Sequence, residues 1–126
     1  MNMYIWVALG GAIGASSRFF VTSMTGRLLG HGFPWGTVTV NVVGSFVMGA
    51  LISFMALKWS ASAEMRAFLT TGVLGGFTTF SAFSLDFATL IERKEHIAAF
   101  AYAAGSVGLS LLAIFAGLTF VRMVLS

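Results

Sequence analysis

The sequence predicts an all-α integral membrane protein with four transmembrane helices, the third of them broken. Composition is the first observation behind this prediction: 58% of the 126 residues are hydrophobic and only 9% are charged, whereas roughly a quarter of the residues of a soluble domain are charged. The second is the presence of four apolar stretches long enough to cross a bilayer, which takes about 20 residues. The third is a run of glycines and hydroxyl side chains, GVLGGFTTFSAFS at 72–84, inside one of these stretches.

The four predicted spans follow one another with short joints between them. They cover approximately Met3–Thr25, Trp35–Leu57, Arg66–Ile91 and His96–Leu125. The joints GRLLGHGFP, KWSASAE and ERKEH contain helix-breaking and charged residues, and they are too short to hold another domain. We therefore expect residues 1–126 to form one transmembrane domain.

Several function classes are disfavoured by the composition. Cysteine is absent, so the chain offers no disulfide framework and no thiolate ligand. A net charge of +3 in so apolar a chain indicates anchoring at the membrane edges, and we expect no nucleic-acid partner. Paired carboxylates, a nucleophile triad and a metal-ligand spacing are also absent from the sequence, so an enzyme is not expected.

Small residues in the first, second and fourth spans predict close helix contacts. The first span contains GGAIGASS, and glycines recur at Gly44, Gly49, Gly105 and Gly108. Such residues let helix backbones approach where lipid provides no hydrophobic drive for association. These contacts could lie within one chain or between chains. Four helices leave little interior space for an ion path, which favours a homo-oligomer.

Positive charges are almost evenly divided between the two predicted membrane faces. One face has the termini and the second loop, with Lys58, Arg66 and Arg122; the other has Arg27, Arg93 and Lys94, plus Arg18 if that deeper residue is counted. Lysines and arginines in short loops normally fix the orientation of a membrane protein. Either one borderline charge decides here, or the chain inserts both ways and the two orientations pair as an antiparallel dimer.

Two polar stripes are predicted on different helices. The second span has Thr37, Asn41 and Ser45, and the fourth has Tyr102, Ser106 and Ser110, each set spaced i, i+4, i+8 and so on one helical face. An unpaired carboxamide or hydroxyl in hydrocarbon is costly, and such groups usually face a bundle interior or a water-filled cavity. The stripes could line a shared narrow groove. Alternatively, the asparagine joins two helices and each serine bonds its own backbone.

The third span contains the predicted break. Gly75 and Gly76 weaken a helix, and the hydroxyls of Thr78 and Thr79 compete for backbone partners. We expect two half-helices whose freed carbonyls could hold a small hard cation; a continuous helix with a glycine-rich contact face is the alternative. Beyond the break, the phenylalanines Phe80, Phe83 and Phe87 share a face, and aromatic ring edges are positive enough to contact an anion.

Together, these segments resemble the Fluc (CrcB-type) fluoride channels over essentially the whole chain. The resemblance is carried by GGAIGASSR, PWGTVTVNVVGS, GVLGGFTTFSAFS and YAAGSVGLS, in this order. It implies a passive fluoride channel in the bacterial inner membrane that exports cytoplasmic fluoride and relieves its toxicity. It further implies a dual-topology antiparallel homodimer in which both copies build each of two pathways.

The resemblance also implies roles for individual residues. Those implied to line or adjoin the fluoride pathway are Asn41, Phe80, Phe83 and Ser110, with Thr79, Tyr102 and Ser106 close by. Backbone carbonyls of Gly75 and Thr78 would bind a structural sodium ion (Na⁺) at the centre of the dimer, and Arg18 would attract anions near the aqueous entrance. Two positions depart from the family: Asp86 stands where relatives often have glutamate, and Ile114 where some have a hydroxyl.

Two functions other than a channel would also suit a small membrane protein with four helices. A small multidrug or guanidinium exporter also has four short helices, but it requires a carboxylate in its first helix, and residues 3–25 contain no Asp or Glu. A non-conducting membrane assembly subunit would explain the glycines and the apolar surface. It would not explain two aligned polar stripes together with a broken helix.

Overall fold

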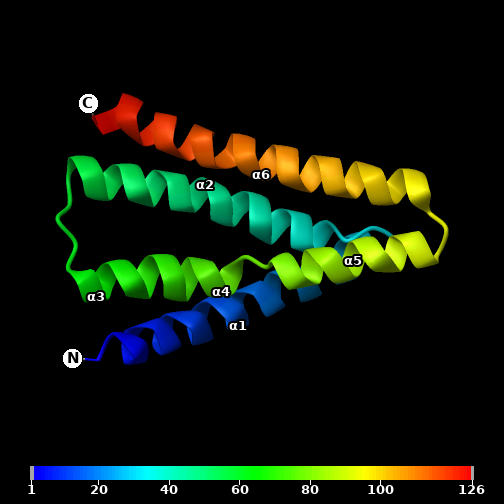
Figure 1. Cartoon of the computed structure of the whole chain (residues 1–126), viewed down its shortest axis with the longest axis horizontal. Coiled ribbons are helices and arrows are strands. Elements are labelled where there is room, and N and C mark those ends of the chain that lie inside the picture. Colours follow the sequence, from blue (N-terminus) through cyan, green and yellow to red (C-terminus); the bar gives the residue numbers. More distant parts are fainter. Residues whose placement is uncertain (1, 126) are drawn as a thin grey trace.

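The chain folds into four long helical segments that run antiparallel to their neighbours in sequence (Figure 1). The structure is a computed structural model, and it describes residues 2–125. Both ends of the chain and the loop after the second helix lie at one end of the bundle, and the other two loops lie at the opposite end. All four segments are long and apolar enough to cross a membrane, as the sequence predicts.

The first, second and fourth segments are continuous helices. Helix α1 covers Met3–Leu29, α2 covers Trp35–Leu57 and α6 covers His96–Leu125. The bounds predicted for α2 and α6 are confirmed, whereas α1 continues four residues beyond the predicted end at Thr25. It stops only at Gly30, whose φ of +80° favours glycine and ends the helix.

The third segment is broken within the stretch that the sequence predicts. It consists of α3 (Ala63–Arg66), a π-helical stretch η1 (Ala67–Leu74), the short α4 (Gly75–Phe77) and α5 (Phe80–Glu92). Gly75 and Gly76 remain helical, and the extended residues are Thr78 and Thr79, with ψ of 160° and 125°. The break therefore lies at the two β-branched residues, which favour extended backbone. The π-helical stretch was not predicted.

Glycines allow two of the helix pairs to approach closely. A Cβ atom on Gly49 or Gly117 would collide with the backbone of the facing helix, so α2 and α6 depend on these glycines for contact. Gly10 and Gly72 do the same between α1 and η1. These contacts lie within one chain, which is one of the two possibilities that the small residues left open. Among residues 2–125, a Cβ on Gly105 or Gly108 would meet no atom of another helix within 4 Å.

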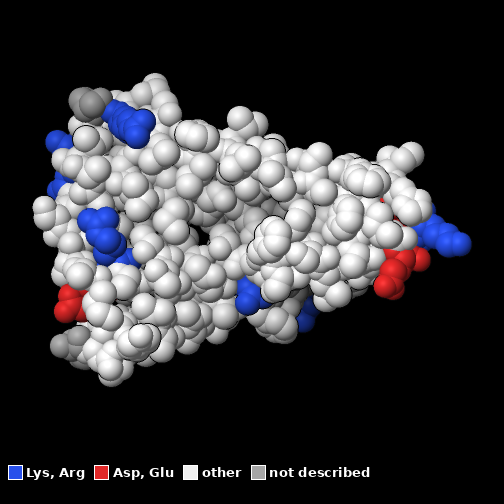
Figure 2. Space-filling model, viewed as in Figure 1, with Lys and Arg blue, Asp and Glu red and all other residues white. Residues whose placement is uncertain are grey.

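Charged side chains gather mainly at the two ends of the long axis (Figure 2). Between these ends the face is uncharged in this view apart from Lys or Arg groups at its lower edge. A belt of uncharged surface between two charged rims is the pattern expected of a protein that spans a bilayer.

Candidate functional site

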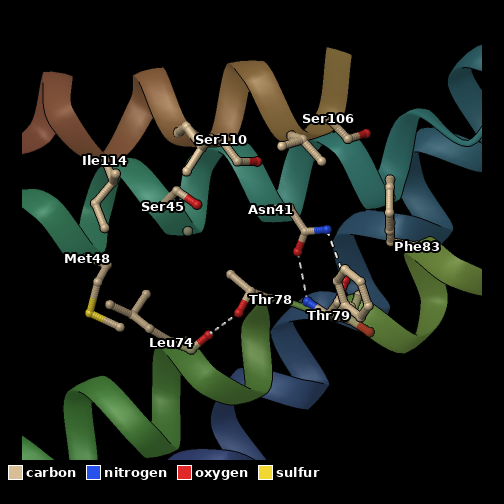
Figure 3. Close-up of a pocket in the computed structure, with 14 residues that line it drawn as sticks. Asn41, Ser45, Met48, Leu74, Thr78, Thr79, Phe83, Ser106, Ser110 and Ile114 are labelled. Carbon is tan, nitrogen blue, oxygen red and sulfur yellow. Dashed lines mark hydrogen bonds between the residues drawn. The ribbon is translucent and has the colours of Figure 1, made fainter. Parts of the chain in front are cut away.

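A cavity of about 370 Å³ opens beside the break, between the third segment and the pair of helices α2 and α6 (Figure 3). We call it the central cavity. Its polar and aromatic lining comprises Asn41, Ser45, Thr78, Thr79, Phe80, Phe83, Ser106 and Ser110, and its apolar lining comprises Gly44, Met48, Leu74, Val107, Leu111 and Ile114. The lining contains no Lys, Arg, Asp or Glu.

Asn41 holds the break open through two hydrogen bonds to one residue. Its Oδ1 accepts a bond from the backbone N–H of Thr79 at 2.7 Å, and its Nδ2 donates to the carbonyl of Thr79 at 3.0 Å. Both bonds satisfy backbone groups that an interrupted helix would leave unpaired in lipid. An amide nitrogen carries two hydrogens, so one N–H of Asn41 remains available to the cavity.

Three serines give the central cavity unused donors. Within residues 2–125, Ser106 is buried and its Oγ has no hydrogen-bond partner. Neither Ser45 nor Ser110 bonds another residue of the cavity (Figure 3). In contrast, the hydroxyl of Ser84 donates to the carbonyl of Phe80, one turn earlier. The reading in which Ser106 satisfies itself is therefore wrong, and its hydroxyl remains an unused donor within residues 2–125.

The phenylalanines of α5 separate into two groups. Phe80 and Phe83 line the central cavity, with their ring centroids 5.5 Å apart. Phe83 also lies 5.2 Å from the ring of Tyr102. Phe87, on the same helical face, instead packs edge-on against Phe100 and does not line the cavity. Only two of the three aligned rings can therefore present an edge to a ligand there.

One residue of each polar stripe hydrogen-bonds Asp86. The hydroxyl of Thr37 donates to Asp86 Oδ2 at 2.7 Å, and the hydroxyl of Tyr102 donates to the same oxygen at 3.0 Å. Tyr102 is 1% exposed and does not line the central cavity. Its hydroxyl is thus already used, at the end of the stripe that Ser106 and Ser110 continue into the cavity.

Asp86 borders a second, smaller cavity near the first loop. We call it the loop-side cavity: it measures about 170 Å³ and is lined by Thr22, Thr25, Gly26, residues 30–31 and 33–37, and Asp86. Thr22 and Thr25 donate their hydroxyl hydrogens to backbone carbonyls of α1. With Thr37 bonded to Asp86, every threonine hydroxyl that lines this cavity is already used as a donor.

Arg18 lies against the end of the first half of the broken helix. Its Nε donates to the carbonyl of Gly76 at 3.0 Å, and the residue is half-buried. It does not line the central cavity. Its predicted electrostatic effect at an entrance stays a prediction.

The carbonyls of Gly75 and Thr78 remain without a hydrogen bond to any of residues 2–125. The backbone N–H of Thr79, which would pair with Gly75 in a continuous helix, bonds Asn41 instead. The N–H of Ala82, four residues after Thr78, bonds the hydroxyl of Thr79. No group of three or more His, Asp or Glu side chains gathers within these residues, so backbone oxygens are the available ligands for a cation.

The structure brings most of the predicted pathway residues together. Asn41, Thr79, Phe80, Phe83, Ser106 and Ser110 line one cavity, whereas Tyr102 and Arg18 lie outside it. Sequence reasoning missed the part played by Asp86, where both stripes end. Its position three residues after Phe83, as the only acid well inside a span, was the available signal.

Comparison with known proteins gives a consistent match. The family model described as CrcB-like protein, Camphor Resistance (CrcB), matches residues 5–118. A Rhizobium etli protein named fluoride-specific ion channel FluC is 55% identical over 122 residues, which cover 97% of this chain and 98% of the relative. A Chelativorans protein of the same name is 56% identical over 119 residues, covering 94% and 95% of the two chains.

Proposed function

This chain belongs to the CrcB-like protein family, and from that membership we propose that it is a fluoride-selective ion channel. It is a multi-pass bacterial membrane protein and not an enzyme. The observation that carries the proposal is the central cavity, which combines unused hydroxyl and amide donors with aromatic rings and has no charged side chain.

The chemistry of fluoride explains why such a cavity suits it. A selective pore must replace the hydration shell of its ion with close ligands, yet must not bind the ion so tightly that it cannot leave. Hydroxyls of Ser106 and Ser110 and the spare N–H of Asn41 can donate to the anion, and the edges of Phe80 and Phe83 can contact it. A fixed cation would bind too strongly. Flow down the electrochemical gradient then exports cytoplasmic fluoride without ATP and relieves its toxicity.

We further propose that the channel is an antiparallel homodimer with dual topology. The side chain of Phe80 is 76% exposed although it lines the central cavity, so this chain alone does not enclose the ion. Within residues 2–125, a Cβ on Gly105 or Gly108 would meet no atom of another helix within 4 Å, so these glycines leave room for a second copy. Near-equal positive charge on the two faces allows both insertions. A tag on the C-terminus should be accessible from both sides of the cell membrane; a tag found on one side only would contradict dual insertion.

We also propose that the break holds a structural sodium ion. The carbonyls of Gly75 and Thr78 have no hydrogen-bond partner within residues 2–125, and Gly75 is exposed on this chain. Unwound backbone carbonyls in membrane proteins are suitable ligands for Na⁺. When bound, the ion would supply positive charge that stabilises these oxygens. Replacing Na⁺ by a bulky organic cation should lower the thermal stability of the purified protein, whereas an unchanged melting temperature would contradict the site.

Liposome efflux tests the proposed function directly. Purified protein is reconstituted into vesicles loaded with potassium fluoride or potassium chloride, and release is followed with ion-selective electrodes in the presence of valinomycin. We expect fast fluoride release and chloride release close to that of protein-free vesicles. Fluoride retained as in protein-free vesicles would overturn the proposal, and equal release of both ions would overturn selectivity.

A further inference from the structure

One face of α1 packs along the first half of the broken helix, as far as the end of α4. Gly10, Gly14 and Arg18 are spaced i, i+4, i+8 and share this face. A Cβ on Gly10 would collide with the backbone of η1, and a Cβ on Gly14 with backbone atoms of Val73 and Phe77. The two glycines thus bring the helices into contact, and Arg18 follows one turn later, where α4 ends.

Arg18 contacts the carbonyl of Gly76, which has no hydrogen-bond partner within the broken helix. The carbonyl of Gly76 would accept from the N–H of Phe80 in a continuous α-helix, but Phe80 begins the next helix. Nε of Arg18 donates to that carbonyl at 3.0 Å. Cationic side chains stabilise helix C-termini in this way, through the hydrogen bond and through the negative end of the helix dipole.

We propose that Arg18 is a positioning residue, which caps the first half of the broken helix from α1 and so fixes the break beside the central cavity. Asn41 does the same for the second half by bonding both backbone groups of Thr79. The inference deepens the proposed function. It replaces the expectation that Arg18 acts mainly as a free charge that attracts anions.

The cap also determines which carbonyls stay available at the break. Arg18 occupies the oxygen of Gly76, while those of Gly75 and Thr78 have no partner within residues 2–125. Loss of the cap would leave the carbonyl of Gly76 unpaired as well, which is costly within a membrane. The break would then shift to recover a hydrogen bond, and Thr78 and Thr79 would shift with it.

Three substitutions at Arg18 separate the hydrogen bond from the charge. Arg18→Gln places an N–H donor at the position of the arginine Nε and removes the charge. Arg18→Met removes both. Arg18→Lys retains the charge and puts a carbon where Nε lies. A role in attracting anions predicts that Gln and Met behave alike and that Lys resembles wild type.

We expect Arg18→Gln to retain fluoride efflux within about threefold of wild type and Arg18→Met to slow it roughly tenfold, the rate change for about 1.4 kcal/mol. The Gln variant should melt close to the wild-type temperature and the Met variant clearly below it. Equal efflux and equal melting for Gln and Met, whether reduced or not, would overturn the proposal.

The melting comparison does not depend on fluoride conduction. If wild-type protein failed to release fluoride, the proposed function would fall, whereas a lower melting temperature for Met than for Gln would still support the cap. A salt series adds a further readout, because about 1 M salt reduces the Debye length to ~3 Å and screens exposed charges. We expect the gap between the Gln and Met variants to persist at high salt; its disappearance would contradict the hydrogen-bond role.

Discussion

The central cavity and the loop-side cavity both contain several hydroxyls, but they differ in what those hydroxyls can still do. In the loop-side cavity, Thr22, Thr25 and Thr37 have given their hydrogens to carbonyls or to Asp86. In the central cavity, Ser106 has no partner within residues 2–125. Polar composition alone therefore does not identify an anion path; unused donors do.

The two cavities also differ in charge. Asp86 borders the loop-side cavity, and its carboxylate would repel a fluoride ion nearby. The lining of the central cavity is uncharged. Tyr102 separates these environments, because its ring lies 5.2 Å from Phe83 on one side while its hydroxyl bonds Asp86 on the other. Substitutions around the two cavities should consequently have very different effects on fluoride efflux.

The largest loss is expected from Asn41→Leu. This change removes two hydrogen bonds to Thr79 and the spare donor together, and each buried group left unpaired costs about 1–3 kcal/mol. We expect fluoride efflux from liposomes to fall by about two orders of magnitude, with a lower melting temperature. Ser53→Ala is the control, since it removes one bond to the carbonyl of Leu118, and neither residue lines the cavity. Efflux from the Asn41 variant equal to that of the control would contradict the role of Asn41.

The next largest effect is expected from Phe83→Ile. Isoleucine keeps the site apolar and removes the positive ring edge, so efflux should fall by at least about tenfold. Phe87→Ile is a matched control one turn along the same helix, because Phe87 packs on Phe100 outside the cavity. Both variants should elute as wild type in size-exclusion chromatography. Similar rates for the two variants would refute the aromatic assignment.

A smaller effect on efflux is expected from Thr37→Val, on the side of the loop-side cavity. The change removes the 2.7 Å bond to Asp86 and leaves the central cavity intact. We expect a loss of stability of about 1 kcal/mol or more, measured by thermal melting, and efflux within about threefold of wild type. Thr39→Val is the comparison, because its hydroxyl bonds only the carbonyl of Trp35 on an open part of α2. A collapse of efflux without a change in melting would place the ion path at Asp86.

The sequence was sufficient for the continuous helices and insufficient for the details of the break. Length and hydropathy fixed α2 and α6 at both ends, because charged or helix-breaking joints flank them. The sequence predicted a break in the stretch with Gly75, Gly76, Thr78 and Thr79 but could not tell which of these residues leave the helix. Both glycines stay helical, and a Cβ on Gly76 would collide with α1. Packing against α1 thus favours a helical backbone at Gly76 and an extended backbone only from Thr78 on.

Side-chain pairing was the part of the site that periodicity could not supply. Helical spacing predicted that Asn41, Ser106 and Ser110 lie on polar helix faces, and all three line the central cavity. It could not reveal that Arg18 bonds Gly76 or that Thr37 and Tyr102 share Asp86, because those contacts join helices that lie far apart in the sequence. Such contacts depend on how the helices pack.

The central claim is that unused hydroxyl donors replace the water around fluoride, and a pair of triple variants tests it most directly. The first variant changes Ser45, Ser106 and Ser110 to alanine. The second changes Thr70, Ser84 and Thr89 to alanine as well, and the hydroxyls of these three residues donate to the backbone one turn earlier. Fluoride efflux is measured for both in the same liposomes. We predict that the first variant is slower than wild type by at least about tenfold and that the second stays within about twofold; equal rates for the two would contradict the claim.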